Sequence, residues 1–328
     1  MRGKILVIRG GAIGDFILTL PAIAALRRQF PEAHLEVLGY PHIIQLALAG
    51  GLVNRIQSIE ARALAGFFAR GGELAGDLAD YFSEFDLIVS YLYDPDEIFR
   101  QNVTRCTSAQ FIPGPHRPNE KARIHATKVY LKPLERLAIF EADAVPHLRM
   151  SQGTSGSNRP AARAPHSPSA GPPNRPVESA KTLALHPGSG SERKNWPESK
   201  WAELLERLVH SSDFSLLIVG GVAEGERLQR LAAALPPTRT RVAQNLPLAD
   251  LAVQLQACAA FIGHDSGISH LAAALGLPGL LLWADTPEEI WRPPSPKMTI
   301  LRYPAGLSKL PTNVVIDHLA KLCLLPKP

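Results

Sequence analysis

The decapeptide Phe261-Ile262-Gly263-His264-Asp265-Ser266-Gly267-Ile268-Ser269-His270 decides how the fold is interpreted. An apolar run ends at a glycine, an Asp-Ser-Gly turn follows, and an apolar helical pattern begins at once. This order predicts a strand, a tight turn and a helix. The first N–H groups of a helix lack partners and lie at the positive end of its dipole, which suits a phosphate. The sequence therefore predicts a phosphorylated ligand near Ser266 and Gly267.

Strand-like and helix-like segments alternate along most of the chain. The strand-like runs are almost continuously apolar, as in parallel strands covered on both faces. The predicted strands are Lys4–Ile8, His34–Leu38, Phe85–Ser90, Thr182–Leu185, Leu216–Val219, Ala259–Ile262 and Gly279–Leu282. The predicted helices are Phe16–Gln29, Glu198–His210, Glu224–Leu235, Leu248–Cys258 and Ser266–Leu275. We expect an α/β fold of two doubly wound, Rossmann-like domains facing across a cleft that holds the ligand. A last helical run, 314–324, could pack back across that cleft.

The segment 151–180 divides the two domains. It is rich in Pro, Ser and Gly and contains no aromatic residue. Such a composition cannot bury enough apolar area to offset the entropy of ordering it, so we predict a flexible linker. The chain of 328 residues then consists of a first domain, 1–150, and a second domain, 181–328.

Composition excludes several classes of protein. The net charge of +5 is thinly spread, which argues against nucleic acid as a partner. No apolar run reaches the ~18–20 residues of a membrane span, and the N-terminus shows no signal-peptide pattern. Cys106, Cys258 and Cys323 lie far apart in no metal-binding spacing, so we expect a cytoplasmic protein.

One local charge bias remains. The stretch 100–136 holds eight basic residues and two acidic ones. It is either a solvated face or a basic rim for an anionic acceptor or a membrane surface.

The turn after the first strand, Arg9-Gly10-Gly11-Ala12-Ile13-Gly14-Asp15, lacks the G-x-G-x-x-G spacing of dinucleotide-binding proteins. Gly10, Gly11 and Gly14 instead permit a tight turn and the close approach of another molecule. Asp15 lies at or near a helix N-terminus, where an N-cap is one reading. The other is a carboxylate at the mouth of the cleft that takes a proton from a substrate hydroxyl.

The loop from His186 to Pro197 follows the first strand of the second domain. Its glycines let backbone N–H groups converge, Ser189 adds a hydroxyl and Lys194 adds a mobile positive charge. The loop is either a phosphate cradle or a plain connection. Further along, Glu224 could accept hydrogen bonds from a ribose diol or stabilise the first turn of a helix.

Two other patterns have structural interpretations. Asp94-Pro95-Asp96-Glu97 resembles a D-x-D metal site, but we favour Asp94 as an N-cap with Pro95 at the first helical position and Glu97 at the third. His264 and His270 flank the Asp-Ser-Gly turn, and a lone His is more often structural than catalytic. His270 could still reach a phosphate or brace the turn.

Taken together, these motifs resemble the glycosyltransferase family 9 heptosyltransferases, which build the inner core of lipopolysaccharide. The matching pieces are 5–15 with Leu20-Pro21-Ala22, 186–189, 194–197, 265–270 and Trp291-Arg292-Pro293. The resemblance implies a GT-B fold and an inverting transfer that needs no metal and no cofactor. It implies a nucleotide-sugar donor, typically ADP-L-glycero-β-D-manno-heptose, bound mainly by the C-terminal domain. Many relatives carry Gly-Pro-Thr where this chain has Ala284-Asp285-Thr286.

The resemblance also assigns roles to single positions. Asp15 matches the general base, Lys194 a lysine on the donor phosphates and Ser189 a phosphate-side hydroxyl. The remaining matches are Glu224 near the ribose, Leu246 against adenine, and Asp265, Ser266, Gly267 and His270 in the diphosphate turn.

A mechanism follows from these parts. The acceptor hydroxyl attacks the anomeric carbon, Asp15 removes its proton, and Lys194 with the helix start at Ser266 stabilises the leaving diphosphate. The acceptor would be an anionic glycolipid or glycan, with peripheral contact at the inner membrane. Three alternatives stay open: a relative that glycosylates a protein or another glycan from a different nucleotide sugar, an NAD-dependent oxidoreductase, and a binding protein that keeps the fold without catalysis. The missing G-x-G-x-x-G spacing argues against the oxidoreductase.

Overall fold

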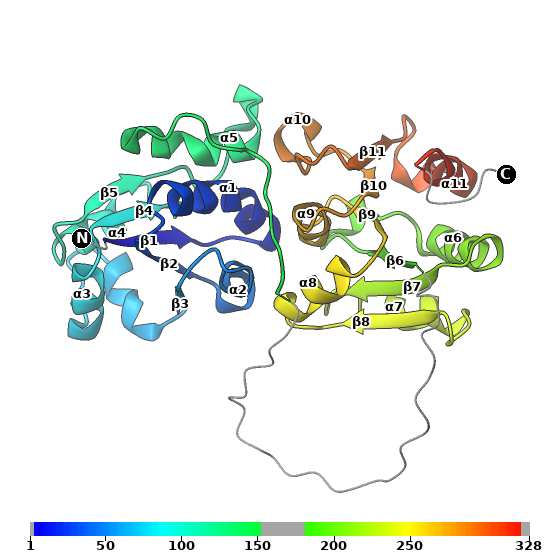
Figure 1. Ribbon diagram of the computed structural model, residues 1–328, viewed down its shortest axis with the longest axis horizontal. Coiled ribbons are helices and arrows are strands. Elements are labelled where there is room, and N and C mark those ends of the chain that lie inside the picture. Colours follow the sequence, from blue (N-terminus) through cyan, green and yellow to red (C-terminus); the bar gives the residue numbers. More distant parts are fainter. Residues whose placement is uncertain (1–2, 152–180, 323–328) are drawn as a thin grey trace, which may run out of the picture.

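The computed structural model describes residues 3–151 and 181–322. The predicted linker 151–180 lies outside the described residues except for Ser151, as does the end of the run 314–324. Within the described part, two parallel sheets form two α/β domains (Figure 1). The first sheet has the strand order β3-β2-β1-β4-β5 and the second the order β11-β10-β9-β6-β7-β8. The expected α/β fold of two doubly wound domains is confirmed.

The strands of the first sheet are β1 Lys4–Arg9, β2 His34–Gly39, β3 Arg55–Ser58, β4 Leu87–Ser90 and β5 Gln110–Pro113. Those of the second are β6 Thr182–Leu185, β7 Ser215–Gly220, β8 Thr240–Gln244, β9 Ala260–His264, β10 Gly279–Trp283 and β11 Met298–Arg302. The α-helices are α1 Ile13–Gln29, α2 Pro41–Ala49, α3 Gly76–Ser83, α4 Ile98–Thr104, α5 Ala126–Leu131, α6 Glu198–Ser211, α7 Gly225–Ala233, α8 Leu248–Gln256, α9 Gly267–Ala274, α10 Glu288–Trp291 and α11 Thr312–Lys321. Short 3-10 helices include η1 Arg62–Phe68 and η4 Glu192–Lys194.

The strands that the sequence did not predict share one position. β3 and β5 are the edges of the first sheet, and β8 and β11 are the edges of the second. An edge strand is partly solvated, so it carries polar residues and lacks the continuous apolar run of a central strand. The sequence Arg-Ile-Gln-Ser of β3 illustrates this: its side chains are exposed or half-buried.

Helix α1 joins the two domains. It begins at Ile13, almost one turn before the predicted start at Phe16. Every side chain from Phe16 to Ile23 is buried, and a helix that is buried on all sides must lie between two layers. One side packs on its own sheet and the other on α9 of the second domain, with α2 packing against α8 beside it (Figure 1).

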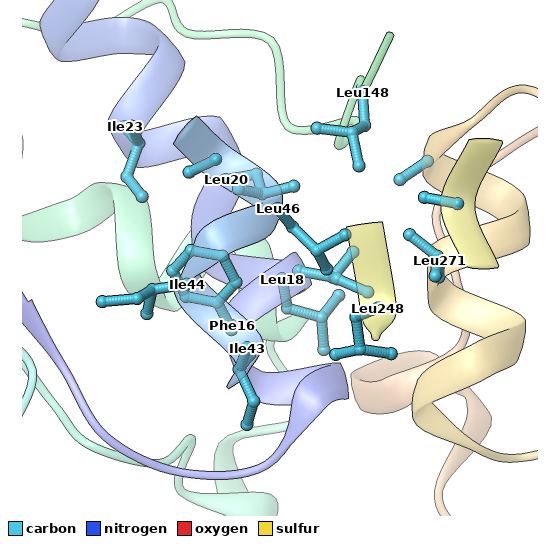
Figure 2. Close-up of a cluster of buried hydrophobic side chains, with 14 of the residues drawn as sticks. Phe16, Leu18, Leu20, Ile23, Ile43, Ile44, Leu46, Leu148, Leu248 and Leu271 are labelled. Carbon is cyan, nitrogen blue, oxygen red and sulfur yellow. The ribbon is translucent and has the colours of Figure 1, made fainter. Parts of the chain in front are cut away.

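A single apolar core therefore spans both domains. Figure 2 shows its centre, where side chains of α1 and α2 such as Leu18 and Leu46 approach Leu248 of α8 and Leu271 of α9. Leu148, on the segment that leaves the first domain, completes the cluster, and its N–H donates to the carbonyl of Ala274 at 2.8 Å. The apolar contact fixes how the two sheets face one another.

Two further cores cover the outer faces of the sheets. The outer core of the first domain holds η1, α3 and α4 against the sheet. The outer core of the second domain holds α6, α7 and α11. Helix α11 packs on α6 within its own domain, at the far end from the first domain (Figure 1). The option that the last helix returns across the cleft is therefore wrong, because Val315 and Leu319 bury their side chains in the second domain's outer core.

Candidate functional site

Both sheets are parallel throughout, and in each of them the order in which strands are added along the chain reverses at one point. In the first sheet the point lies between β1 and β4, and in the second between β6 and β9. Parallel α/β sheets bind ligands outside the carboxyl ends of their strands at such a point. The loops after these four strands line three neighbouring cavities: the nucleotide cavity, named for the ligand that the sequence predicts there, the central cavity and the first-domain cavity.

The nucleotide cavity has a volume of about 540 Å³. It is lined by loops of the second domain and by the start of α1 from the first domain. Most of the predicted donor-site residues lie here, namely Ser189, Glu224, Leu246, Ser266 and Gly267, and the turn glycine Gly14 also lines the cavity. Glu224 is buried, and its Oε2 accepts a hydrogen bond from the N–H of Gly221 at 2.8 Å. It lies at the N-cap of α7, so both interpretations of this carboxylate fit its position.

Two helix N-termini converge on the nucleotide cavity. The sequence predicted the one at α9, whose first residues Gly267 and Ile268 line it. The start of α1 lines the same cavity through Ala12 and Ile13. Two positive dipole ends at one cavity strengthen its suitability for an anion.

The helices can meet because both carry glycine at the contact. A Cβ on Gly267 would lie 2.7 Å from the Cβ of Ile13, and one on Gly14 would lie 3.3 Å from Cδ2 of His270. The close approach predicted for Gly14 is therefore made to the second domain. Gly11 adopts φ +98°, which fits the predicted tight turn, and Gly10 and Gly11 line the first-domain cavity.

A hydrogen-bond chain fixes the protons around Ser266. Ser269 Oγ donates to the carbonyl of His264, so the 3.1 Å contact between the two serine hydroxyls uses the proton of Ser266. Ser266 Oγ then accepts from the N–H of Ser269 as the N-cap and from Nδ1–H of His186 at 3.2 Å. Burial lowers the pKa of His186 to about 4, so the ring is neutral at pH 7. Its Nε2 is left as an acceptor on a ring that lines the nucleotide cavity. The sequence contained His186 but gave no signal for this role.

The other two buried histidines differ. His264 accepts from the N–H of Trp196 at 2.9 Å and donates to the carbonyl of Gly188 at 3.2 Å, which makes it a brace between loops. His270 lines the central cavity, and its buried Nδ1 has no partner among the described residues. Burial lowers the pKa of His264 to about 3 and that of His270 to about 4.

The central cavity, of about 260 Å³, connects the two domains. Its walls include Asp15 and Arg117 from the first domain and Lys194, Asp265, Gly267 and His270 from the second. Lys194 Nζ lies 2.6 Å from Oδ2 of the buried Asp265. Thr286 Oγ1 donates to the same oxygen at 2.6 Å, so the threonine of the divergent Ala-Asp-Thr segment supports Asp265. The predicted base and the predicted phosphate-binding lysine thus share one cavity.

Asp15 is held in place yet accessible. It occupies the third position of α1, so it is not the N-cap, which is Ala12. Its Oδ2 accepts from the N–H of Ala12 at 3.2 Å, and its Oδ1 lies 3.7 Å from Nη2 of Arg9. The Asp15 side chain is 32% exposed and Arg9 only 2%. The carboxylate therefore closes the first turn of the helix and still faces the cavities.

Arg9 is a residue whose importance the sequence did not reveal. Its guanidinium donates to the carbonyls of Tyr91 at 3.3 Å, His116 at 2.8 Å and Asp15 at 3.3 Å. These three segments all line the first-domain cavity, which has a volume of about 730 Å³. Asp15 and Arg117 line both this cavity and the central one. The first-domain cavity therefore leads to the predicted base.

A set of polar contacts joins the two domains where α5 of the first lies beside α10 of the second (Figure 1). Glu120 accepts from Nε1 of Trp291 at 3.2 Å, and Arg123 lies 3.3 Å from Glu289. The guanidinium of Arg117 stacks over the Trp291 ring at 5.2 Å. His125 accepts from the N–H of Thr127 through Nδ1, so Nε2 carries the proton and donates to the carbonyl of Arg292 at 2.8 Å. We call these contacts the latch (Figure 1, α5 beside α10).

The remaining predictions concern charge. The carboxylate of Asp94 accepts from the N–H groups of Phe99 and Arg100 in the first turn of α4. The helix begins only at Ile98 and its N-cap is Glu97, so the predicted N-cap at Asp94, with Pro95 and Glu97 as the first and third helical residues, is wrong. Among the described residues no group of three or more His, Cys, Asp and Glu could hold a metal ion. In the basic stretch 100–136, four of the eight cations pair with carboxylates, which favours a solvated face for much of it: Arg100, Arg117, Arg123 and Lys132. No helix in 3–151 or 181–322 is long and apolar enough to cross a membrane.

Comparison with known proteins shows which family the chain resembles in sequence. The profile described as Glycosyltransferase family 9 (heptosyltransferase) matches residues 141–318. Lipopolysaccharide heptosyltransferase 1 of Pseudomonas aeruginosa is 42% identical over 93 residues, 28% of this chain and 26% of that protein. The first curated relatives are each matched over only 26% to 34% of their length.

Solved structures agree along almost the whole chain. The glycosyl transferase family 9 structure from Veillonella parvula gives a TM-score of 0.75 at 17% identity, covering 99% of both chains. The E. coli heptosyltransferase WaaC with ADP gives 0.70 at 18% identity, covering 97% of this chain and 99% of that one. These likenesses establish the GT-B fold. Because the family profile matches more than half of its residues, the chain belongs to glycosyltransferase family 9, the heptosyltransferase family.

Proposed function

We propose that this protein is an inverting glycosyltransferase that moves a heptose from ADP-heptose to an acceptor of the lipopolysaccharide core. One observation carries the proposal: Asp15 of one domain and Lys194 and Gly267 of the other line a single cavity between a nucleotide-sized cavity and a second open one. A donor, a reaction centre and an acceptor then lie in sequence along the cleft.

The donor fits the nucleotide cavity from end to end. Leu246 offers an apolar contact for the base, and the Glu224 carboxylate offers an acceptor for ribose hydroxyls. The diphosphate would lie against the starts of α1 and α9, where two helix dipoles and Ser189 favour negative charge. The ADP bound by WaaC supports adenine as the base.

The reaction then follows from the central cavity. The acceptor hydroxyl attacks the anomeric carbon as its bond to the diphosphate breaks, and the configuration inverts. Asp15 accepts the hydroxyl proton, since its accessible carboxylate faces the cavity from the acceptor side. Lys194, paired with Asp265, stabilises the charge that develops on the departing diphosphate. A fixed cation and two helix ends supply that charge stabilisation in our scheme, so transfer should persist in EDTA.

The first-domain cavity would take the acceptor. Arg117 lines both this cavity and the central one, and it offers a positive charge to an anionic glycolipid or glycan. The names of the curated relatives support a lipopolysaccharide acceptor. Work in the cytoplasm and peripheral contact with the inner membrane stay predictions.

Donor profiling tests the proposal. Thermal unfolding is measured with ADP, ADP-heptose, UDP, a UDP-sugar and NAD at equal concentrations, because a ligand that binds only the folded state raises Tm. We expect ADP and ADP-heptose to raise Tm and NAD to have no effect. Transfer is then measured from ADP-heptose to lipopolysaccharide from a strain that lacks core heptose. Protection by NAD, or transfer from UDP-sugars in preference to ADP-heptose, would refute the assignment. Donor hydrolysis without transfer to lipopolysaccharide would move the acceptor to a protein or another glycan.

A further inference from the structure

The first-domain cavity carries exposed aromatic rings that no step of the transfer reaction uses. Tyr93, three residues beyond the end of β4, is 70% exposed, and Phe68, the last residue of η1, is 45% exposed. Both line the cavity, as does the half-buried Tyr40. Large aromatic groups left open to water at a cavity wall indicate a surface that a ligand covers.

These rings are held by their neighbours. Phe68 stacks on the buried Phe99 with ring centres 4.8 Å apart and planes 30° apart, so one face is covered and the other is free. Tyr93 makes an edge contact with the His116 ring at 4.5 Å. A ring supported on one side loses little freedom when a ligand covers its other side, so it is well prepared to bind.

The rest of the lining is polar and charged. Glu60, Asp15, His116 and Arg117 surround the rings, so the cavity offers hydrogen-bond acceptors, cations and aromatic faces together. A lipid chain would leave these polar groups without partners, which costs free energy. A sugar ring suits them, because its hydroxyls can bond the polar groups while its C–H face covers the negative face of an aromatic ring.

We infer that Tyr93 and Phe68 form a platform that binds a pyranose ring of the acceptor and presents one hydroxyl to Asp15. This inference rests on the proposed function, since it names the chemistry that recognises the acceptor of that reaction. The platform and the base are connected because Asp15 lines the same cavity as both rings. Stacking selects the shape and the exposed C–H face of the sugar, whereas Arg117 selects charge.

Saturation-transfer NMR tests the platform without knowledge of the full acceptor. The wild-type protein, saturated with ADP, is mixed with methyl pyranosides, the matching uronic acids and an octyl glucoside below its micelle concentration. We expect transfer to ring C–H protons of at least one sugar. Tyr93→Ala and Phe68→Ala should reduce that signal at least threefold, while Tyr93→Phe should retain it because the ring face is kept.

Phe140→Ala is the matched control. Phe140 is an aromatic residue of the same domain with 71% exposure, and it lines none of the three cavities. Its removal should leave the sugar signal unchanged. Transfer only to the octyl chain, no transfer to any sugar ring, or an unchanged signal in Tyr93→Ala would overturn the inference.

The Tm increase with ADP is measured on every variant. An unchanged increase in Tyr93→Ala shows that the fold and the donor site persist, so a lost sugar signal belongs to the platform. If ADP does not protect the wild type, the proposed function fails. If ADP protects but no sugar binds, only the platform fails.

Discussion

The nucleotide cavity and the first-domain cavity lie at equivalent points of two similar sheets, yet they are built differently. The nucleotide cavity is formed by glycine turns, two helix starts and the buried, neutral His186. The first-domain cavity is lined by the buried Arg9 and Tyr91 and, to a larger extent than the nucleotide cavity, by exposed side chains such as Phe68 of η1 and Tyr93 after β4. The nucleotide cavity therefore depends largely on turns and helix ends, which the fold fixes. The first-domain cavity depends more on side chains, which can change without disturbing the sheet.

The largest expected effect comes from Asp15, whose carboxylate lines both the first-domain cavity and the central cavity. Asp15→Asn keeps the size of the side chain and its place beside the N–H of Ala12 but removes the base. Turnover should fall about 10³-fold, within the range typical of general-base loss, while the Tm increase with ADP stays unchanged. Asp77→Asn, an exposed acid in the first turn of α3, is the control. Full turnover in Asp15→Asn would remove this residue as the base.

The second largest effect is expected from the loss of a cation on the donor side of the central cavity. Lys194→Ala removes the cation that contacts Asp265, so transfer should fall about 10²-fold and ADP protection should weaken as well. Arg193→Ala, its neighbour on η4, lies outside the central cavity and should change neither. An unaltered response to ADP in Lys194→Ala would place the diphosphate elsewhere.

One added methyl group can disturb the packing contact between the N-termini of α1 and α9. In Gly267→Ala the new Cβ would lie 2.7 Å from Ile13 Cβ and 3.1 Å from the backbone nitrogen of Gly14. We expect a loss of about 1–3 kcal/mol in stability with roughly tenfold slower transfer. Gly76→Ala, where a Cβ meets nothing within 4 Å, is the matched control. Equal Tm values for the two variants would show that the domains do not depend on this contact.

The pH dependence of stability should arise mainly on the nucleotide side. An unfolded histidine has a pKa of about 6.5, but burial lowers the pKa of His186 to about 4, that of His264 to about 3 and that of His270 to about 4. As pH falls below 6.5, the unfolded chain binds protons that the folded chain does not, so stability falls. Each imidazole contributes up to about 1.4 kcal/mol per pH unit.

Thermal unfolding between pH 7 and pH 5 measures this slope. In His186→Asn the amide can still donate to Ser266. The slope of the free energy of unfolding against pH should therefore decrease by the contribution of one imidazole, up to about 1.4 kcal/mol per pH unit. His210→Asn, an exposed site on α6, should keep the wild-type slope. A Tm independent of pH in the wild type would contradict the neutral, buried state of these rings.

The smallest effect is expected on the acceptor side. Arg117→Ala removes an exposed cation that already pairs with Glu120 at 2.9 Å, so acceptor KM should rise only about fivefold, equivalent to ~1 kcal/mol. Protection by ADP should not change. Lys132→Ala, which removes a comparable ion pair outside the cavities, is the control. A larger loss of ADP binding than of acceptor binding would place Arg117 on the donor.

The same contrast explains what the sequence could predict. The glycine turns, the apolar central strands and the helix starts leave local patterns, so β1, β9 and the residues around Ser266 were predicted from sequence. The edge strands are partly polar and left no such pattern. Arg9, His186 and Tyr93 matter because segments far apart in the chain meet around them, and no local pattern encodes that meeting.

The latch and the shared apolar core both hold the two domains together, by forces with different sensitivities. Exposed ion pairs such as Arg123–Glu289 are screened by dissolved salt, whereas packing of α1 on α9 is not. Raising the ionic strength should loosen the latch while the apolar core acts as a pivot. We therefore expect product release to depend on electrolyte concentration through residues such as Glu289, which line none of the three cavities.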